Sequence, residues 1–386
     1  MKDSFQYLYA SIGTQFSWYL PDLIAHKLDF FGSKDFGSNI QYVWAHPQKD
    51  IIYLALSDGG PGKKGSNHSI LACSIDRNTG EPVILGSQQR VPYRPIHLCT
   101  DETGRNLFTA YNNPSSLSVH KIETNGDIGK KTIQLSRDQV GIFGHQVRVT
   151  PDGKTLIVVC RGYDATDTAS EQPGCLKLFD LEDGELRDTK TISPFGGLGF
   201  GARHLDFHPN GNWFYLAIER QSELHTFKIG DDGIADNPLF TTSTLSKPLQ
   251  LGARQANSAI HLHPSGKFVY VSNRTYAAAP INAGVIPNGE DNIAVFEIDE
   301  ISFKPSLIQS VDTFGSLPRT FSIHKSGKML VAANSEAARK LNFNGKATSL
   351  PLSLVSYEIA ANGKLALKQQ INFHAKDQLL FWAGFL

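Results

Sequence analysis

This sequence of 386 residues has few cysteines, no net charge and no long apolar run. Its four cysteines, at positions 73, 99, 160 and 175, show neither C-x-x-C spacing nor a tight framework, which argues against a disulfide scaffold or a zinc site. They are typical of buried thiols in a reducing compartment. The 37 Lys and Arg balance 37 Asp and Glu without forming a basic block, so we expect no nucleic-acid partner. No apolar run approaches membrane-spanning length, and the N-terminus does not resemble a signal peptide; we expect a cytoplasmic protein that binds no membrane.

Motifs for common covalent, nucleotide and metal chemistry are absent as well. No G-x-S-x-G elbow occurs, so chemistry through an acylated serine is not indicated. The glycine-rich GGLGFGA at 196–202 lacks the β-α-β context of a dinucleotide site and is interpreted as a turn. Five histidines recur near turns and are interpreted as structural groups rather than metal ligands, namely His204, His208, His261, His263 and His324. We therefore expect no metal and no cofactor.

What the sequence does contain is an internal repeat. The segments HQVRVTPDGKTLIVVCR from 145, RHLDFHPNGNWFYLAIE from 203 and SAIHLHPSGKFVYVSNR from 258 each join an alternating segment, a turn with glycine and a β-rich run. Further copies begin at 41, 96 and 319. The turn positions are 49, 104, 153, 211, 266 and 327, at intervals of 55, 49, 58, 55 and 61 residues. This period suits a unit of four strands.

A second, more polar strand pair with Asp-Gly turns follows copies such as the third and fourth, so each unit is predicted to be four antiparallel strands. Units of this period indicate an all-β fold, a β-propeller. Six copies leave strands at both chain ends, and pairing FQYLYASIG with QLLFWAGFL would complete a seventh blade and close the ring. We predict one propeller domain spanning 1–386. Two stacked β-sandwiches are the competing architecture, which the regular period disfavours.

The propeller geometry predicts which residues converge. In each blade the innermost strand precedes the turn and the next strand returns antiparallel, so residues eight before and eight after the turn should meet at one mouth of the channel. Eight before gives Gln41, Ile96, His145, Arg203, Ser258 and Arg319. Eight after gives Ser57, Asn112, Arg161, Glu219, Arg274 and Ser335.

Several arginines with one carboxylate and one histidine suit an anionic, oxygen-rich small molecule. Guanidinium groups bind carboxylate or phosphate in pairs of hydrogen bonds and stabilise an oxyanion, while Glu219 or His145 could move protons. Of the two, His145 is favoured as the proton carrier, because imidazole titrates nearest neutral pH. Polar residues at these positions are also compatible with ion pairs that only bridge blades.

At these residues the chain resembles a known family. GARHLDFHPNG with the later Glu219, SAIHLHPSGKFVYVSNR, LPRTFSIHKSGKMLVAANS and HQVRVTPDGKTL are similar to the matching segments of the seven-bladed propeller lactonases. That family includes propeller-type 6-phosphogluconolactonases and 3-carboxy-cis,cis-muconate lactonizing enzymes. The resemblance implies that the His, Glu and two Arg proposed as the site of the muconate enzymes correspond to His145, Glu219, Arg203 and Arg274. Further candidates for substrate binding are Arg319, Arg161, His204 and Gln41.

Three segments depart from the family pattern, FSWYLPDLIAHKLDFFGSKDFGS near the N-terminus, SPFGGLGFGARH before the fourth copy, and TYAAAPINAGVIPNGEDN after Arg274. Long loops at a channel mouth usually shape a pocket, so these segments are expected to set specificity.

The expected activity is hydrolysis of a small anionic or sugar-derived lactone by a monomer or small homo-oligomer. A muconate-type cycloisomerase is the alternative because it needs the same residue types, and a non-catalytic binding scaffold is a further alternative. The scaffold is disfavoured because the WD signature is missing.

Overall fold

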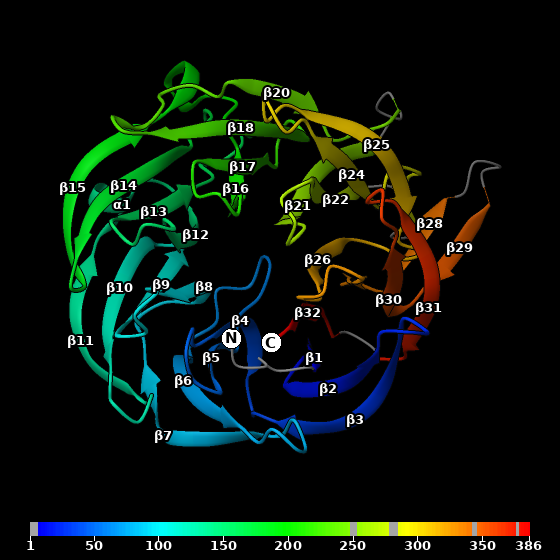
Figure 1. Cartoon of the computed structure of the whole chain (residues 1–386), viewed down its shortest axis with the longest axis horizontal. Coiled ribbons are helices and arrows are strands. Elements are labelled where there is room, and N and C mark those ends of the chain that lie inside the picture. Colours follow the sequence, from blue (N-terminus) through cyan, green and yellow to red (C-terminus); the bar gives the residue numbers. More distant parts are fainter. Residues whose placement is uncertain (1–6, 248–252, 278–284, 342–345, 376–377) are drawn as a thin grey trace.

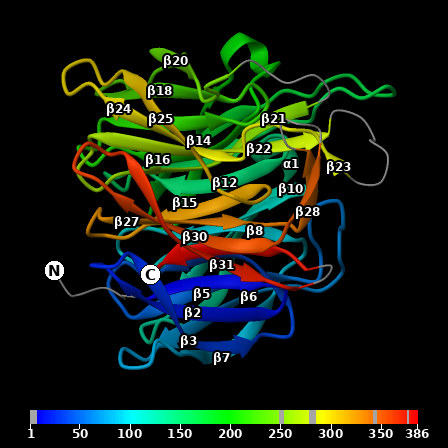
Figure 2. The ribbon, with the colours of Figure 1, turned by 90° about the vertical axis from the view of Figure 1, so that its right-hand side faces the viewer.

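The computed structural model describes residues 7–247, 253–277, 285–341, 346–375 and 378–386. Figure 1 shows the strands arranged as radial blades around a central axis, and Figure 2 shows the same ring from the side. The predicted propeller is confirmed, since the described residues form seven blades built on four-stranded antiparallel order. No helix among them is long and apolar enough to cross a membrane.

The first three blades follow one another directly along the chain. The first blade comprises β4 (Asn39–Ala45), β5 (Ile51–Ser57), β6 (His68–Ile75) and β7 (Pro82–Arg90). The second comprises β8 (Pro95–Thr100), β9 (Asn106–Asn112), β10 (Ser115–Ile122) and β11 (Ile128–Leu135), followed by the short helix α1 (Arg137–Val140). The third comprises β12 (Gly144–Val149), β13 (Thr155–Cys160), β14 (Cys175–Glu182) and β15 (Glu185–Ile192), followed by a 3₁₀ turn at Pro194–Gly197.

The next three blades carry small additions. The fourth comprises β16 (Ala202–Phe207), β17 (Trp213–Ile218) and β18 (Glu223–Gly230), with β19 (Gly233–Ile234) and β20 (Phe240–Ser243) both paired to β18. The fifth comprises β21 (Ala253–Leu262), β22 (Phe268–Ala277), β24 (Asn292–Ile298) and β25 (Pro305–Asp312). The sixth comprises β26 (Pro318–Ile323), β27 (Met329–Asn334), β30 (Leu352–Ile359) and β31 (Leu365–Phe373). A separate small sheet contains β23 (Val285–Ile286), β28 (Ala338–Leu341) and β29 (Ala347–Leu350).

The seventh blade closes the ring with both ends of the chain, as the sequence predicted. Its inner strand β32 (Leu380–Phe385) pairs with β1 (Leu8–Ile12), which continues into β2 (Gln15–Asp22) and β3 (Lys27–Asp35). A buried cluster joins this blade to the first one and includes Tyr9, Phe16, Trp18, Leu54 and Trp382. The unusual N-terminal segment is therefore mostly an ordinary outer strand pair of this blade.

Turn histidines link neighbouring blades on the face that carries the repeat turns. Nε2 of His208 lies 3.1 Å from the carbonyl oxygen of Gly266, and Nε2 of His263 lies 2.9 Å from that of Gly327. Gly266 has a φ of +75°, and a Cβ there would lie 2.6 Å from Nε2 of His208. Glycine is thus required both by the turn conformation and by the close approach of His208 from the preceding blade. For His208 and His263, the predicted hydrogen bonds near the turns are present.

Candidate active site

A β-bulge occurs in the inner strand of every blade at the same height. In β16, for example, Ala202 pairs with Ile218 and His204 with Ala217, which leaves Arg203 as the extra residue. The bulged residues of the seven inner strands are Gln41, Ile96, His145, Arg203, Ser258 with Ala259, Arg319 and Phe381. A bulge bends the strand and re-aims a side chain. The residue eight positions before each turn is therefore the bulged residue of its inner strand, at the mouth of the ring.

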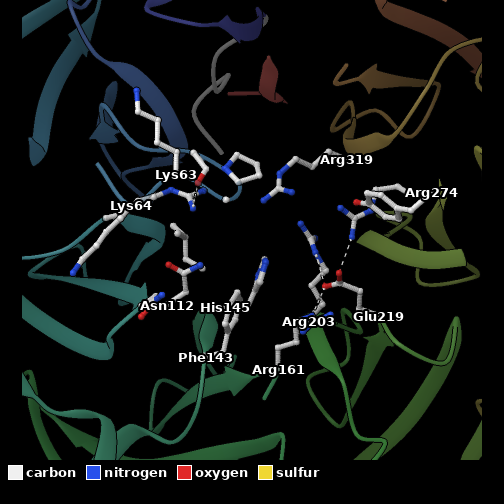
Figure 3. A pocket seen from close by; sticks show the side chains of 17 residues that line it. Lys63, Lys64, Asn112, Phe143, His145, Arg161, Arg203, Glu219, Arg274 and Arg319 are labelled. Carbon is white, nitrogen blue, oxygen red and sulfur yellow. Dashed lines mark hydrogen bonds and ion pairs between the residues drawn. The ribbon is translucent and has the colours of Figure 1, made fainter. Parts of the chain in front are cut away.

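The candidate site is a pocket of about 460 Å³ at this mouth. Figure 3 shows its side chains converging from several blades. Six of the eight predicted site residues line it: His145, Arg161, Arg203, Glu219, Arg274 and Arg319. Its other lining residues are Gly60, Pro61, Gly62, Lys63, Lys64, Arg94, Ile96, Asn112, Asn113, Phe143 and Tyr276.

Glu219 forms ion pairs with three arginines on one side of the pocket. Its Oε2 lies 3.1 Å from Nε of Arg161 and 3.4 Å from Nε of Arg203, and its Oε1 lies 3.2 Å from Nη2 of Arg274. Burial alone would raise the pKa of this carboxyl, but the adjacent arginines outweigh it and lower the pKa to about 2. Glu219 is therefore ionised at every physiological pH. It orients three guanidinium groups and is poorly suited to carry a proton.

His145 occupies a different position in the pocket. Its side chain is buried, and its Nδ1 has no hydrogen-bond partner among the described residues. Burial, followed by the charges of Arg203 and Arg319, lowers the pKa of this imidazole well below its usual value. The ring is neutral at neutral pH and can accept a proton. The preference for His145 over Glu219 as proton carrier is consistent with these two environments.

Two further arginines of the pocket, Arg94 and Arg319, form no ion pair with Glu219, although the charges of Glu219 and Glu336 act on Arg319. Arg94 donates from Nε to Oε1 of Gln41 at 2.8 Å and from Nη1 to the carbonyl oxygen of Gly60 at 3.0 Å. The guanidinium of Arg319 lies 4.5 Å from the ring centroid of Phe381. Among the residues that the structure describes, neither arginine has an ion pair with a carboxylate. Burial, followed by the charge of Arg319, lowers the pKa of Arg94 to about 9, so it keeps its charge at neutral pH.

Lys63 and Lys64 lie on the far side of the pocket from Glu219 (Figure 3). They belong to a loop between β5 and β6 in which Gly60 and Lys63 exchange backbone hydrogen bonds, and Asp58 accepts from the backbone of Ser66 and Asn67. The sequence-based prediction missed this loop and Arg94. The signal was visible as the insertion DGGPGKKGSN, which is rich in glycine and carries adjacent lysines.

Two predicted substrate-binding residues do not line the pocket. Gln41 is buried behind Arg94, and His204 lies next to the floor, with its ring centroid 5.0 Å from that of His145. The bulge explains both positions. At β16 it directs Arg203 into the pocket and leaves the next residue, His204, facing the axis of the ring. At β4 it places Gln41 where its amide supports a neighbouring side chain.

The expectation that three unusual segments shape the pocket is met only in part by the residues that line it. None of residues 193–201 lines it, because this loop packs on the segment after β13: Gly199 donates to Oε1 of Glu171 at 2.6 Å and Gly174 to the carbonyl of Gly197 at 2.9 Å. The segment at 16–38 forms β2 and β3. From the third segment Tyr276 reaches the pocket, and residues 278–284 lie outside the described part of the chain.

Across the described residues, no cluster of three or more His, Cys, Asp or Glu side chains has the arrangement of a metal site. The positive charges of the pocket are arginine and lysine.

Comparison with known proteins gives a consistent result. A family model described as "Lactonase, 7-bladed beta-propeller" matches residues 22–372. The 6-phosphogluconolactonase of Bacillus subtilis is 26% identical over 325 residues, covering 81% of this chain and 83% of that protein. The 6-phosphogluconolactonase of Formosa agariphila is 26% identical over 340 residues, covering 86% and 88%.

Solved structures share the fold. A protein of Bacteroides uniformis superposes with a TM-score of 0.74 at 21% identity, covering 99% of this chain and 100% of that one. The periplasmic gluconolactonase of Pseudomonas aeruginosa superposes with a TM-score of 0.69 at 18% identity, covering 95% and 96%.

Proposed function

The chain belongs to the family of seven-bladed β-propeller lactonases, and we propose that it hydrolyses a small anionic lactone derived from a sugar. The relatives named 6-phosphogluconolactonase make a phosphorylated sugar lactone the first candidate substrate. The observation that carries the proposal is a difference among the arginines of the pocket. Arg161, Arg203 and Arg274 form ion pairs with Glu219, whereas among the described residues Arg94 and Arg319 have no carboxylate within ion-pair distance.

This difference favours one orientation of the substrate. A phosphate or carboxylate gains most where cations form no ion pair with a carboxylate, so Arg94 and Arg319, with Lys63 and Lys64 near them, would bind the anionic group. Arg203 and Arg274 are already held by Glu219, and their geometry is fixed before the substrate arrives. Fixed donors are what the carbonyl oxygen of an ester requires as it becomes an oxyanion.

In the hydrolysis, His145 would accept a proton from water as the water oxygen attacks the lactone carbonyl. Arg203 would stabilise the tetrahedral oxyanion, with Arg274 as its neighbour. Collapse of this intermediate breaks the bond between the carbonyl carbon and the ring oxygen. The ring oxygen takes the proton back from His145 and leaves as a hydroxyl, and the product is a hydroxy acid.

The test is hydrolysis of 6-phosphogluconolactone and of unphosphorylated gluconolactone, with a 3-carboxymuconate included for the cycloisomerase alternative. R94A and R319A should each lower kcat/KM for the phosphorylated lactone by about 10- to 100-fold, the loss of a charge-assisted hydrogen bond. Neither variant should change kcat/KM for gluconolactone to a comparable extent. Equal losses on both substrates would contradict the orientation, and turnover of the muconate alone would contradict hydrolysis.

A cytoplasmic location remains part of the proposal. The four cysteines are free and buried, and Cys160 lies directly opposite Cys175 in the pairing of β13 with β14. Facing thiols of this kind are expected to persist in a reducing compartment. Titration of all four thiols in freshly purified, unfolded protein would support the proposal, and two missing thiols would count against it.

A further inference from the structure

Beneath the pocket, titratable side chains continue along the axis of the ring toward the opposite face. The rings of His145 on β12 and His204 on β16 are 5.0 Å apart between centroids. Asp206 lies two residues beyond His204, on the same face of β16, which corresponds to about 7 Å along a strand. Oδ2 of Asp206 lies 3.9 Å from Nδ1 of His261. The four side chains form a row that starts at the proposed base, and we call it the axial row.

The far end of the axial row is open to water. The side chains of Asp206 and His261 are 19% and 37% exposed. Arg148 forms an ion pair with Asp206 at 3.2 Å and lines a hollow among the repeat turns, on the face opposite the pocket. His204 lies deep inside the ring, yet part of its surface is accessible to water. A polar position that a water molecule can reach is one at which water can bridge neighbouring groups.

The hydrogen bonding of the two histidines suits proton transfer. Nη1 of Arg203 lies 3.4 Å from Nδ1 of His204, and because a guanidinium only donates, Nδ1 is the acceptor and Nε2 carries the proton. Nδ1 of His145 has no partner in the described structure. The titratable and charged groups around His204 are Arg203, His145, His97, His261 and Tyr42. Burial, followed by the charge of Arg203, lowers the pKa of His204 well below its usual value. A neutral imidazole both donates and accepts, and a weakly basic one releases its proton again quickly.

The reaction under the proposed function must dispose of a proton. One water molecule adds its oxygen to the carbonyl carbon, one of its two protons goes to the departing ring oxygen, and the other is left over once the product ionises to a carboxylate. The pocket mouth is an unfavourable exit for this proton, because five arginines and two lysines line it against the single carboxylate of Glu219. At the far end of the axial row the local charges are balanced, with Asp206 beside Arg148.

We propose that the axial row is a proton exit, by which the leftover proton, accepted by His145 once the product acid ionises, passes through His204 and the Asp206–His261 pair to solvent on the face opposite the pocket. Anionic substrate and excess proton then use different ends of the ring. This inference rests on the proposed function for its chemistry. Its geometry does not depend on which lactone is hydrolysed.

The experiment compares H204F and H204Q with the wild type on a lactone that the wild type hydrolyses. Proton exit follows ring opening, so kcat should fall by at least about tenfold while kcat/KM is nearly kept, and kcat should recover as the concentration of a small buffer such as imidazole is raised. The wild-type kcat should not depend on buffer concentration. H97F is the matched control, because the imidazole of His97 is also inside the ring and lies 5.7 Å from that of His204 but outside the row.

A proportional loss of kcat and kcat/KM without buffer rescue would overturn the proton exit, because it would mean that His204 only positions His145. An unchanged kcat would overturn it too, since protons would then leave through the pocket mouth. Independently of turnover, solvent exchange of the ring N–H of His145, measured by NMR on ¹⁵N-histidine protein, should slow in H204F and not in H97F. Equal exchange in both would refute the route, whereas a wild type that hydrolyses no lactone would refute only the proposed function.

Discussion

Replacing Glu219 by Gln tests whether one carboxylate holds three arginines of the pocket in place. The substitution keeps the size of the side chain and removes its charge. Three guanidinium groups lie within ion-pair distance of this carboxylate, which is only 12% exposed. In the variant Arg203 and Arg274 remain buried with no carboxylate within ion-pair distance among the described residues, and Arg161 keeps only its pair with Asp164. E219Q should therefore lose both stability and the fixed geometry of the proposed oxyanion donors.

The magnitude follows from the pKa of Glu219, which falls from 4.5 to about 2 in the folded protein because the arginines outweigh burial. A lowering of about 2.5 corresponds to about 3 kcal/mol of stability at neutral pH. Because the folded pKa is the lower one, this contribution is complete above about pH 4.5 and is lost as the pH falls through about 2. About half of it should remain at about pH 3. Removing one partner of a buried ion pair typically costs a similar 3–5 kcal/mol.

The assay is urea unfolding of wild type and E219Q at several pH values from neutral to about 3. The difference in unfolding free energy should be about 3 kcal/mol at neutral pH and about half of that at the acid end. E300Q is the matched control, since Glu300 pairs with Lys267 at a position where both side chains are more than half exposed. Its transition should stay close to the wild type.

Two results would refute this reasoning. A neutral-pH difference no larger than that of E300Q would mean that the cluster contributes no net stability. A difference that stays constant down to the acid end would mean that the pKa of Glu219 is not lowered by the arginines.

Three further predictions concern the base, the ring closure and the turns. H145Q should lose about 100-fold or more in kcat with KM largely kept, and full activity of this variant would exclude His145 as the base. Because the pKa of His145 is lowered, wild-type kcat/KM should stay flat through neutral pH and fall only well below the ordinary imidazole pKa of ~6.5. Deletion of residues 379–386 removes the inner strand of the seventh blade and should abolish cooperative unfolding in calorimetry, whereas an unchanged melting temperature would refute closure by β32. G266A should lower the free energy of unfolding by roughly 1–2 kcal/mol more than G153A, because both positions have positive φ but only the Cβ at 266 would meet His208. Equal losses in urea unfolding would show that the contact between blades contributes nothing.

The sequence predicted the architecture because a propeller repeats one local solution. Each copy needs the same turn glycine and the same alternation of apolar residues, so the period alone indicates four-stranded units. The leftover strands at the two ends then indicate how the ring closes. The same regularity explains why counting eight residues from the turn reached His145, Arg203 and Arg319, since the distance from turn to bulge is the same in each blade.

Tertiary structure alone decided what these residues do. Whether a side chain enters the pocket depends on the bulge and on its neighbours, so Arg203 lines the pocket while the adjacent His204 faces the axis, and Gln41 supports Arg94 rather than the ligand space. Lys63 reaches the site through a loop whose position no repeat specifies. The pKa values of Glu219 and His145 are set by arginines from other blades, brought within a few ångströms by ring closure. A linear sequence encodes the local pattern, but the charges that surround a group are determined by packing between segments far apart in the chain.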